Sequence, residues 1–211
     1  MIPLRLCAAL VSVCLGGMLC IRRKQPLFFK ILLFASASYL LGALLEGCWR
    51  LVYGAAPEGF HIGYLGYVGM WFFLFSSYFG AIDRLADGGE PVYRPYRLAA
   101  LGAPLAVAGL AVYSVLRWGS AASLPLLLLV LPMGLTLYFA MKHLLLPDVE
   151  MGIIRVMRPY NALVVLLGLS QAMSLLPGIS PAAGTGSTLL LCVLLAVMLP
   201  AAEMGVRKWY M

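Results

Sequence analysis

Residues 38–84 read SYLLGALLEGCWRLVYGAAPEGFHIGYLGYVGMWFFLFSSYFGAIDR and contain parts of two apolar segments joined by the short loop 54–60. The full segments, about 27–53 and 62–83, each reach the length of roughly 20 residues that an α-helix needs to cross a bilayer. The first segment carries an acidic side chain, Glu46, far from its N-terminal end. The stretch therefore predicts a helical hairpin that crosses a membrane twice and holds a charged group inside it.

The composition of the whole chain continues this pattern. Its 211 residues are 63% hydrophobic and only 11% charged, and the mean hydropathy is +0.97. A soluble domain carries about 25% charged residues, because its water-facing surface must be covered with them. The sequence therefore predicts an all-α integral membrane protein, with residues 1–211 forming one polytopic domain.

Loops rich in Gly, Pro or charge divide the chain into seven apolar segments. The predicted spans are about 4–21, 27–53, 62–83, 98–117, 122–142, 160–176 and 187–206. The first segment is followed rather than preceded by its strong basic cluster, and no small-residue cleavage motif precedes that cluster. We therefore expect a retained helix and not a signal peptide.

The distribution of basic residues sets the orientation of this layout. Twelve of the 15 Lys and Arg lie beside alternate connections or at the C-terminus, and only Arg5, Arg50 and Arg117 fall on the other side. Because Lys and Arg accumulate on the cytoplasmic side, we predict a seven-helix bundle with its N-terminus outside and its C-terminus in the cytoplasm, in the inner or plasma membrane. The dispersed basic residues, without aromatic platforms between them, do not indicate nucleic acid as a partner.

Glu46 is the strongest candidate for a functional residue. An ionisable side chain within a span costs at least about 2.5 kcal/mol, so it usually faces the bundle interior or water. Arg50 and Tyr53 share its helical face at steps of four and seven residues. Glu46 can therefore belong to a binding site, or it can form only an i,i+4 ion pair with Arg50 near the membrane interface.

The third segment carries both aromatic and small residues. Tyr64, Tyr67, Trp71 and Tyr78 recur at steps of three, four and seven, a stripe explained either by helix packing or by ligand contact. Gly63, Gly66 and Gly69 form a smooth strip, which predicts the close approach of a neighbouring helix. Gln171 in the sixth segment needs a hydrogen-bond partner within the membrane. If the sixth segment packs near the second, the predicted ligand-binding residues of an outward-facing cavity are Glu46, Arg50, Tyr53, Tyr67, Trp71 and Gln171.

Other kinds of chemistry are not indicated by the sequence. His61 and His143 lie at opposite faces of the layout, so they cannot provide paired haem ligands or a His-rich metal site. The five cysteines contain no CxxC pair, and neither a P-loop nor a nucleophile with a base at the same depth is found. We therefore predict no metal, no cofactor and no catalytic residues.

These observations predict a multi-pass membrane protein that binds a small amphipathic or lipid-like ligand, as a sensory or accessory subunit of a membrane or cytoplasmic partner protein. A small-molecule or proton-coupled transporter is the alternative, in which Pro-containing spans move around Glu46. A membrane enzyme acting on lipid, with Glu46 as its acid or base, is a second alternative.

Overall fold

The computed structural model describes residues 2–55, 59–79, 89–147 and 153–210, and its regular structure there is helical. The helices are α1 (Ile2–Arg22), α2 (Leu27–Tyr53), α3 (Gly63–Ser77), α5 (Arg94–Ala100), α6 (Gly102–Trp118), α7 (Ser120–Leu145), α8 (Ile153–Ser174) and α9 (Pro181–Tyr210), with the 3-10 turn η2 (Pro91–Tyr93) before α5. Each predicted span overlaps one of these helices, except the fourth span, which overlaps both α5 and α6. The expected all-α bundle is therefore confirmed.

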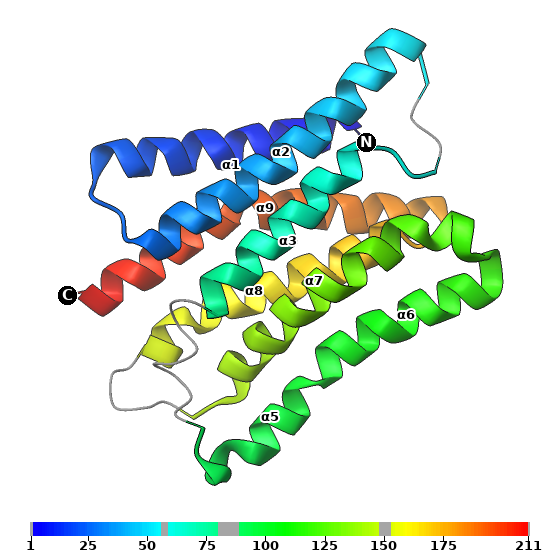
Figure 1. Cartoon of the computed structure of the whole chain (residues 1–211). Coiled ribbons are helices and arrows are strands. Elements are labelled where there is room, and N and C mark those ends of the chain that lie inside the picture. The colour runs from blue at the N-terminus through cyan, green and yellow to red at the C-terminus, as the bar shows by residue number, and fades with distance from the viewer. Residues whose placement is uncertain (1, 56–58, 80–88, 148–152, 211) are drawn as a thin grey trace.

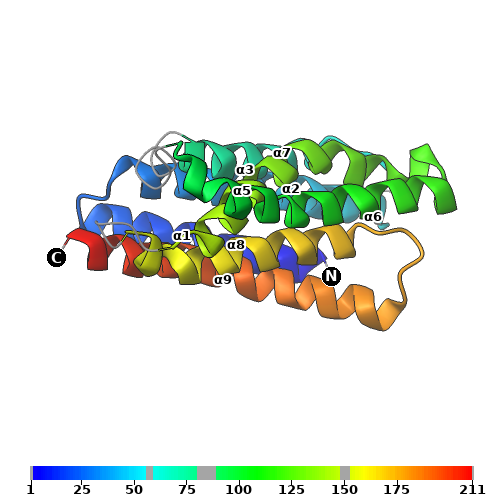
Figure 2. The same cartoon turned by 90° about the horizontal axis from the view of Figure 1, so that it is seen from below.

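The helices have the length and composition of a multi-pass membrane protein. In the described part of the chain, five helical segments are long and apolar enough to cross a membrane: α1, α2, the segment from η2 to α6, α7 and α9. The predicted end of the third span, near residue 83, lies outside the described residues. The two termini lie at opposite ends of the bundle (Figures 1 and 2), as an odd number of crossings requires.

Within the described ranges, six helices form a closed ring. α1 packs on α2, α2 on α3, α3 on α7, α7 on α8, α8 on α9, and α9 on α1. Figure 2 shows this ring as two layers, with α2, α3 and α7 in one and α1, α8 and α9 in the other. α6 packs on α7 at the edge of the bundle (Figure 1). Large, fully buried side chains fill the ring, among them Phe29, Tyr39, Tyr67, Trp71, Tyr78 and Tyr160.

The glycine strip of α3 packs directly on α2. A Cβ atom added to Gly66 would lie 2.6 Å from both the backbone nitrogen of Gly42 and the carbonyl oxygen of Ser38. A Cβ atom on Gly42 would lie 2.6 Å from the carbonyl oxygen of Gly63. The hydroxyl of Ser38 also donates a hydrogen bond to the carbonyl of Gly66 at 2.9 Å. The predicted close approach is confirmed, and it places the C-terminal half of α2 against the start of α3.

Two helices begin earlier than their predicted spans. α8 starts seven residues before residue 160, because Ile154 and Met157 are buried in the core and extend its inward face. α9 starts six residues before residue 187, where the hydroxyl of Ser180 accepts a hydrogen bond from the backbone N–H of Ala183 at 3.3 Å. Pro181 fits the first helical position, since its missing N–H would have no partner there.

Candidate functional site

A buried polar cluster lies where α1, α2 and α3 meet, at the end of the bundle predicted to face outward. We call it the outer cluster, and its residues are Arg5 on α1, Tyr39 and Glu46 on α2, His61 before α3, and Tyr67 on α3. Glu46 is 5% exposed, and its carboxylate oxygen Oε1 lies 3.3 Å from Nε2 of His61. The close packing of α2 on α3 brings these two residues together from the two sides of the loop between the helices.

Arg5 brings a guanidinium group into this cluster from α1. Its Nη2 donates to the hydroxyl of Thr188 on α9 at 3.5 Å. Its Nε is buried and has no hydrogen-bond partner, although the charge of Arg5 acts on Glu46, Tyr39 and Tyr67 nearby. The ion pairs between described residues do not include one between Arg5 and Glu46. Arg5 therefore presents a half-buried positive charge whose buried Nε donor is unused.

The two tyrosines close the inner side of the cluster. The rings of Tyr39 and Tyr67 have centroids 4.7 Å apart, and each side chain is 1% exposed. The hydroxyl of Tyr67 is buried and makes no hydrogen bond of good geometry, although the carboxylate of Glu46 lies close enough to interact with it. A buried polar group left unsatisfied costs about 1–3 kcal/mol, and most such groups in folded proteins have a partner. Arg5 Nε has no partner, and Tyr67 Oη makes no well-formed hydrogen bond with the nearby Glu46, so the cluster has donors available to an occupant that supplies acceptors.

His61 lies at the mouth of the outer cluster. Its imidazole packs on Tyr64 with ring centroids 4.4 Å apart and is 12% exposed. Burial lowers the pKa of His61 below its usual value, and the carboxylate of Glu46 only partly offsets this effect. At neutral pH His61 is therefore uncharged, and it joins Glu46 through a hydrogen bond rather than as a cation.

A groove of about 520 Å³ reaches the outer cluster at His61. The groove is predominantly apolar, and it is lined by Leu45, Cys48, Trp49, Val52, Tyr53, Phe60, His61, Ile62 and Gly63. Because His61 lines the groove on one side and contacts Glu46 on the other, a movement of this one side chain would connect the groove with the buried charges.

Trp71 and Gln171 meet deeper in the bundle. The indole Nε1 of Trp71 donates to Oε1 of Gln171 at 2.9 Å, and both side chains are buried. This hydrogen bond joins α3 to α8 across the interior of the ring, one helical turn beyond Tyr67. This bond gives Gln171 the hydrogen-bond partner that the sequence predicts, and the partner is a protein side chain.

Arg50 and Tyr53 lie on the outside of the bundle. Arg50 is exposed, and Tyr53 is 65% exposed with its ring 4.5 Å from that of Trp49. The last turns of α2 extend beyond the start of α3 (Figure 1), so α3 does not cover these residues, and Arg50 lies beside the start of α1 in a shallow groove. Among the described residues, Glu46 contacts His61 at 3.3 Å and forms no ion pair with Arg50. The expected i,i+4 pair is therefore not formed.

The six predicted residues thus lie in three places. Glu46 and Tyr67 share the outer cluster, Trp71 and Gln171 form a separate buried bond, and Arg50 with Tyr53 is exposed. Sequence reasoning missed Arg5, which was assigned only to the outer side by its charge. The available signal was its position four residues into an apolar helix, because an Arg in a span usually faces the protein interior and needs a partner.

Comparison with known proteins finds no family model, no curated protein and no solved structure that matches the chain. We therefore infer its function from the geometry of the described residues alone.

Proposed function

We propose that this multi-pass membrane protein binds a small amphipathic or lipid-like ligand in the outer cluster, as a sensory or accessory subunit. The observation that carries the proposal is the buried donor Arg5 Nε, which has no partner, together with the Tyr67 hydroxyl, which makes no well-formed hydrogen bond. A ligand whose polar head bears an acceptor oxygen, such as a carboxylate, phosphate or hydroxyl group, would satisfy both donors.

The surroundings of these donors support an amphipathic ligand. Arg5 supplies positive charge to the head, and buried charge-assisted hydrogen bonds are stronger than neutral ones. The groove beside His61 presents mainly apolar side chains, including Leu45, Trp49 and Phe60, to the remainder of the molecule. His61 would have to move aside for entry, and it would then cover the bound head.

Thermal unfolding of the purified protein against a panel of fatty acids, lysophospholipids and small carboxylates tests this proposal. A ligand at 100 times its dissociation constant stabilises the fold by about 2.7 kcal/mol. This corresponds to roughly 5–11 °C for a chain of this size. We expect the shift in wild type and in Tyr113→Phe, and we expect it to disappear in Tyr67→Phe and Arg5→Gln.

The matched pair of tyrosine variants makes the result specific. Both substitutions remove one hydroxyl, but Tyr67 lies in the outer cluster, whereas Tyr113 is 53% exposed on α6, away from the groove at His61. If a compound stabilises Tyr67→Phe and Arg5→Gln as strongly as wild type, then it binds elsewhere and the proposal is wrong.

Proton-coupled transport is a second candidate, favoured by the 3.3 Å contact between Glu46 and the partly accessible His61. Two titratable groups in contact at the mouth of a bundle can exchange a proton with the outside. Substrate uptake or proton movement into proteoliposomes, lost in Glu46→Gln, would support transport. Saturable binding without flux would support the sensory or accessory role instead.

A further inference from the structure

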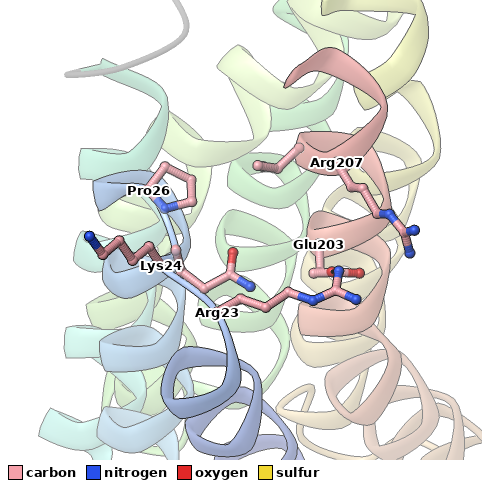
Figure 3. Close-up of a pocket in the computed structure, with 7 residues that line it drawn as sticks. Arg23, Lys24, Pro26, Glu203 and Arg207 are labelled. Carbon is pink, nitrogen blue, oxygen red and sulfur yellow. The ribbon is translucent and has the colours of Figure 1, made fainter. Parts of the chain in front are cut away.

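A second groove lies at the opposite end of the bundle, which is predicted to face the cytoplasm. Its volume is about 400 Å³, within the range of small-molecule sites. It lies between the turn that joins α1 to α2 and the last turns of α9 (Figure 3). The lining residues are Arg23, Lys24, Gln25, Pro26, Glu203, Val206 and Arg207.

The side chains of this groove carry an excess of positive charge. Arg23 reaches from the turn to α9, where its Nη1 lies 3.1 Å from Oε1 of Glu203 (Figure 3). This ion pair neutralises the carboxylate of the groove. Lys24 and Arg207 are exposed, and no ion pair or hydrogen bond between described residues involves their side chains. Three cations and one carboxylate leave two uncompensated positive charges around the groove.

The cations stand on different sides of the groove and not in one row. In Figure 3, Arg207 lies beside Glu203 on α9, whereas the amine of Lys24 points from the turn to the other side of Pro26. The two side chains point away from each other, to either side of the pair of Arg23 and Glu203, so each can meet an anion at its own edge of the groove. The ion pair of Arg23 with Glu203 fixes the distance between the turn and α9, so the groove is held open between them.

Apolar surface adjoins the cations directly. Pro26 and Val206 belong to the lining of the groove. Beside it along the chain, Ile21 is 89% exposed, Leu27 is 72% exposed and Met204 is 57% exposed. These three exposed apolar side chains lie within three residues of basic residues at the helix ends. Positive charge next to exposed apolar surface matches a molecule with an anionic head and a hydrocarbon body.

We propose that this groove binds the phosphodiester headgroup of an anionic glycerophospholipid, with the acyl chains lying on the apolar ends of α1, α2 and α9. Basic pockets between helices on the cytoplasmic side of membranes suit such headgroups, because each Lys or Arg near an anionic surface adds attraction. A free phosphate ion would use the cations but not the apolar surface, and we therefore assign the site to the lipid. The inference is independent of the outer cluster.

Native mass spectrometry of the detergent-purified protein with added dioleoyl phosphatidylglycerol tests the assignment. The test variant is Lys24→Gln with Arg207→Gln, which leaves the pair of Arg23 and Glu203 intact. We expect its affinity for phosphatidylglycerol to fall about 30-fold, equivalent to about 2 kcal/mol. The matched control is Lys30→Gln with Arg94→Gln, which removes the same charge from exposed positions outside the groove and should change the affinity less than threefold.

Each of the following results would overturn the assignment. The first is unchanged binding of phosphatidylglycerol by the Lys24 and Arg207 double variant. The second is an equal loss in the control variant, since this would show a general effect of charge. The third is displacement of the lipid by millimolar inorganic phosphate, or equal affinity for dioleoyl phosphatidylcholine, because the site would then recognise a free anion or any phospholipid. All variants are first checked for wild-type thermal unfolding, so that a loss of binding reports on the groove.

Discussion

Replacing Tyr67 with Phe should stabilise the ligand-free protein, although it deletes a polar group from the interior. The hydroxyl of Tyr67 is buried and makes no well-formed hydrogen bond, even with the nearby Glu46, whereas its ring packs on Tyr39 at 4.7 Å. Phe keeps the ring and removes only the unsatisfied oxygen. Such an oxygen costs about 1–3 kcal/mol, so we expect a gain of about 1 kcal/mol or more in the free energy of unfolding.

Thermal unfolding of the delipidated protein measures this gain. For a chain of 150–250 residues, 1 kcal/mol corresponds to about 2–4 °C in the melting temperature. Tyr53→Phe is the control, because its hydroxyl is on an exposed side chain and should change stability by less than about 0.5 kcal/mol. A loss of 1 kcal/mol or more in Tyr67→Phe would refute the reasoning, since the hydroxyl would then be hydrogen-bonded without any ligand.

Three further changes have defined outcomes. Gly66→Ala should lower the free energy of unfolding by about 1–3 kcal/mol, because the added Cβ would lie 2.6 Å from the backbone of α2. Gly109→Ala is the control and should raise the free energy of unfolding by about 0.5–1 kcal/mol, because its Cβ would meet nothing within 4 Å. Denaturant unfolding compares the two variants. Gln171→Leu should cost about 0.6–1.7 kcal/mol in the same assay, since it leaves the indole N–H of Trp71 without its acceptor, and an unchanged midpoint would show that the bond adds nothing. Because burial lowers the pKa of His61, the unfolded chain takes up a proton before the folded one does, and the melting temperature should fall as pH drops below about 6.5. His61→Gln should flatten this slope, and a slope that persists in the variant would assign it to other groups.

The helices were predictable from the sequence, because low charge and the spacing of apolar segments leave few alternatives in a membrane. The glycine strip also predicted correctly that another helix packs closely on α3, because residues without side chains permit close contact with any neighbouring helix. The early start of α9 was not predicted from its polar residues, because Ser180 and the Gly- and Ser-containing sequence that follows are equally typical of a loop. Ser180 can be distinguished as a helix cap rather than a loop residue only from the hydrogen bond that the backbone N–H of Ala183 donates to its hydroxyl.

The candidate site was only partly predictable. Glu46 could be identified as a site residue from its type and its place in the span alone, because a carboxylate within a span has to face the protein interior. The partners of Glu46 were not identified, because Arg50 and Tyr53, four and seven residues beyond it, lie where α2 extends past α3 and α3 does not cover them. Arg5 reaches the outer cluster through the contact of α1 with α2, and Gln171 reaches Trp71 across the ring. Both depend on which helices are adjacent, and the spacing of residues within one helix does not contain that information.

The proposal that the outer cluster holds a ligand is tested most directly by an experimental density map of the protein purified from its own membrane. We expect density that belongs to neither protein nor a single water, within hydrogen-bond distance of both Arg5 Nε and Tyr67 Oη and continuing toward the groove at His61. A map in which both atoms are hydrogen-bonded to protein groups, or share one ordered water with no further density, would contradict the proposal.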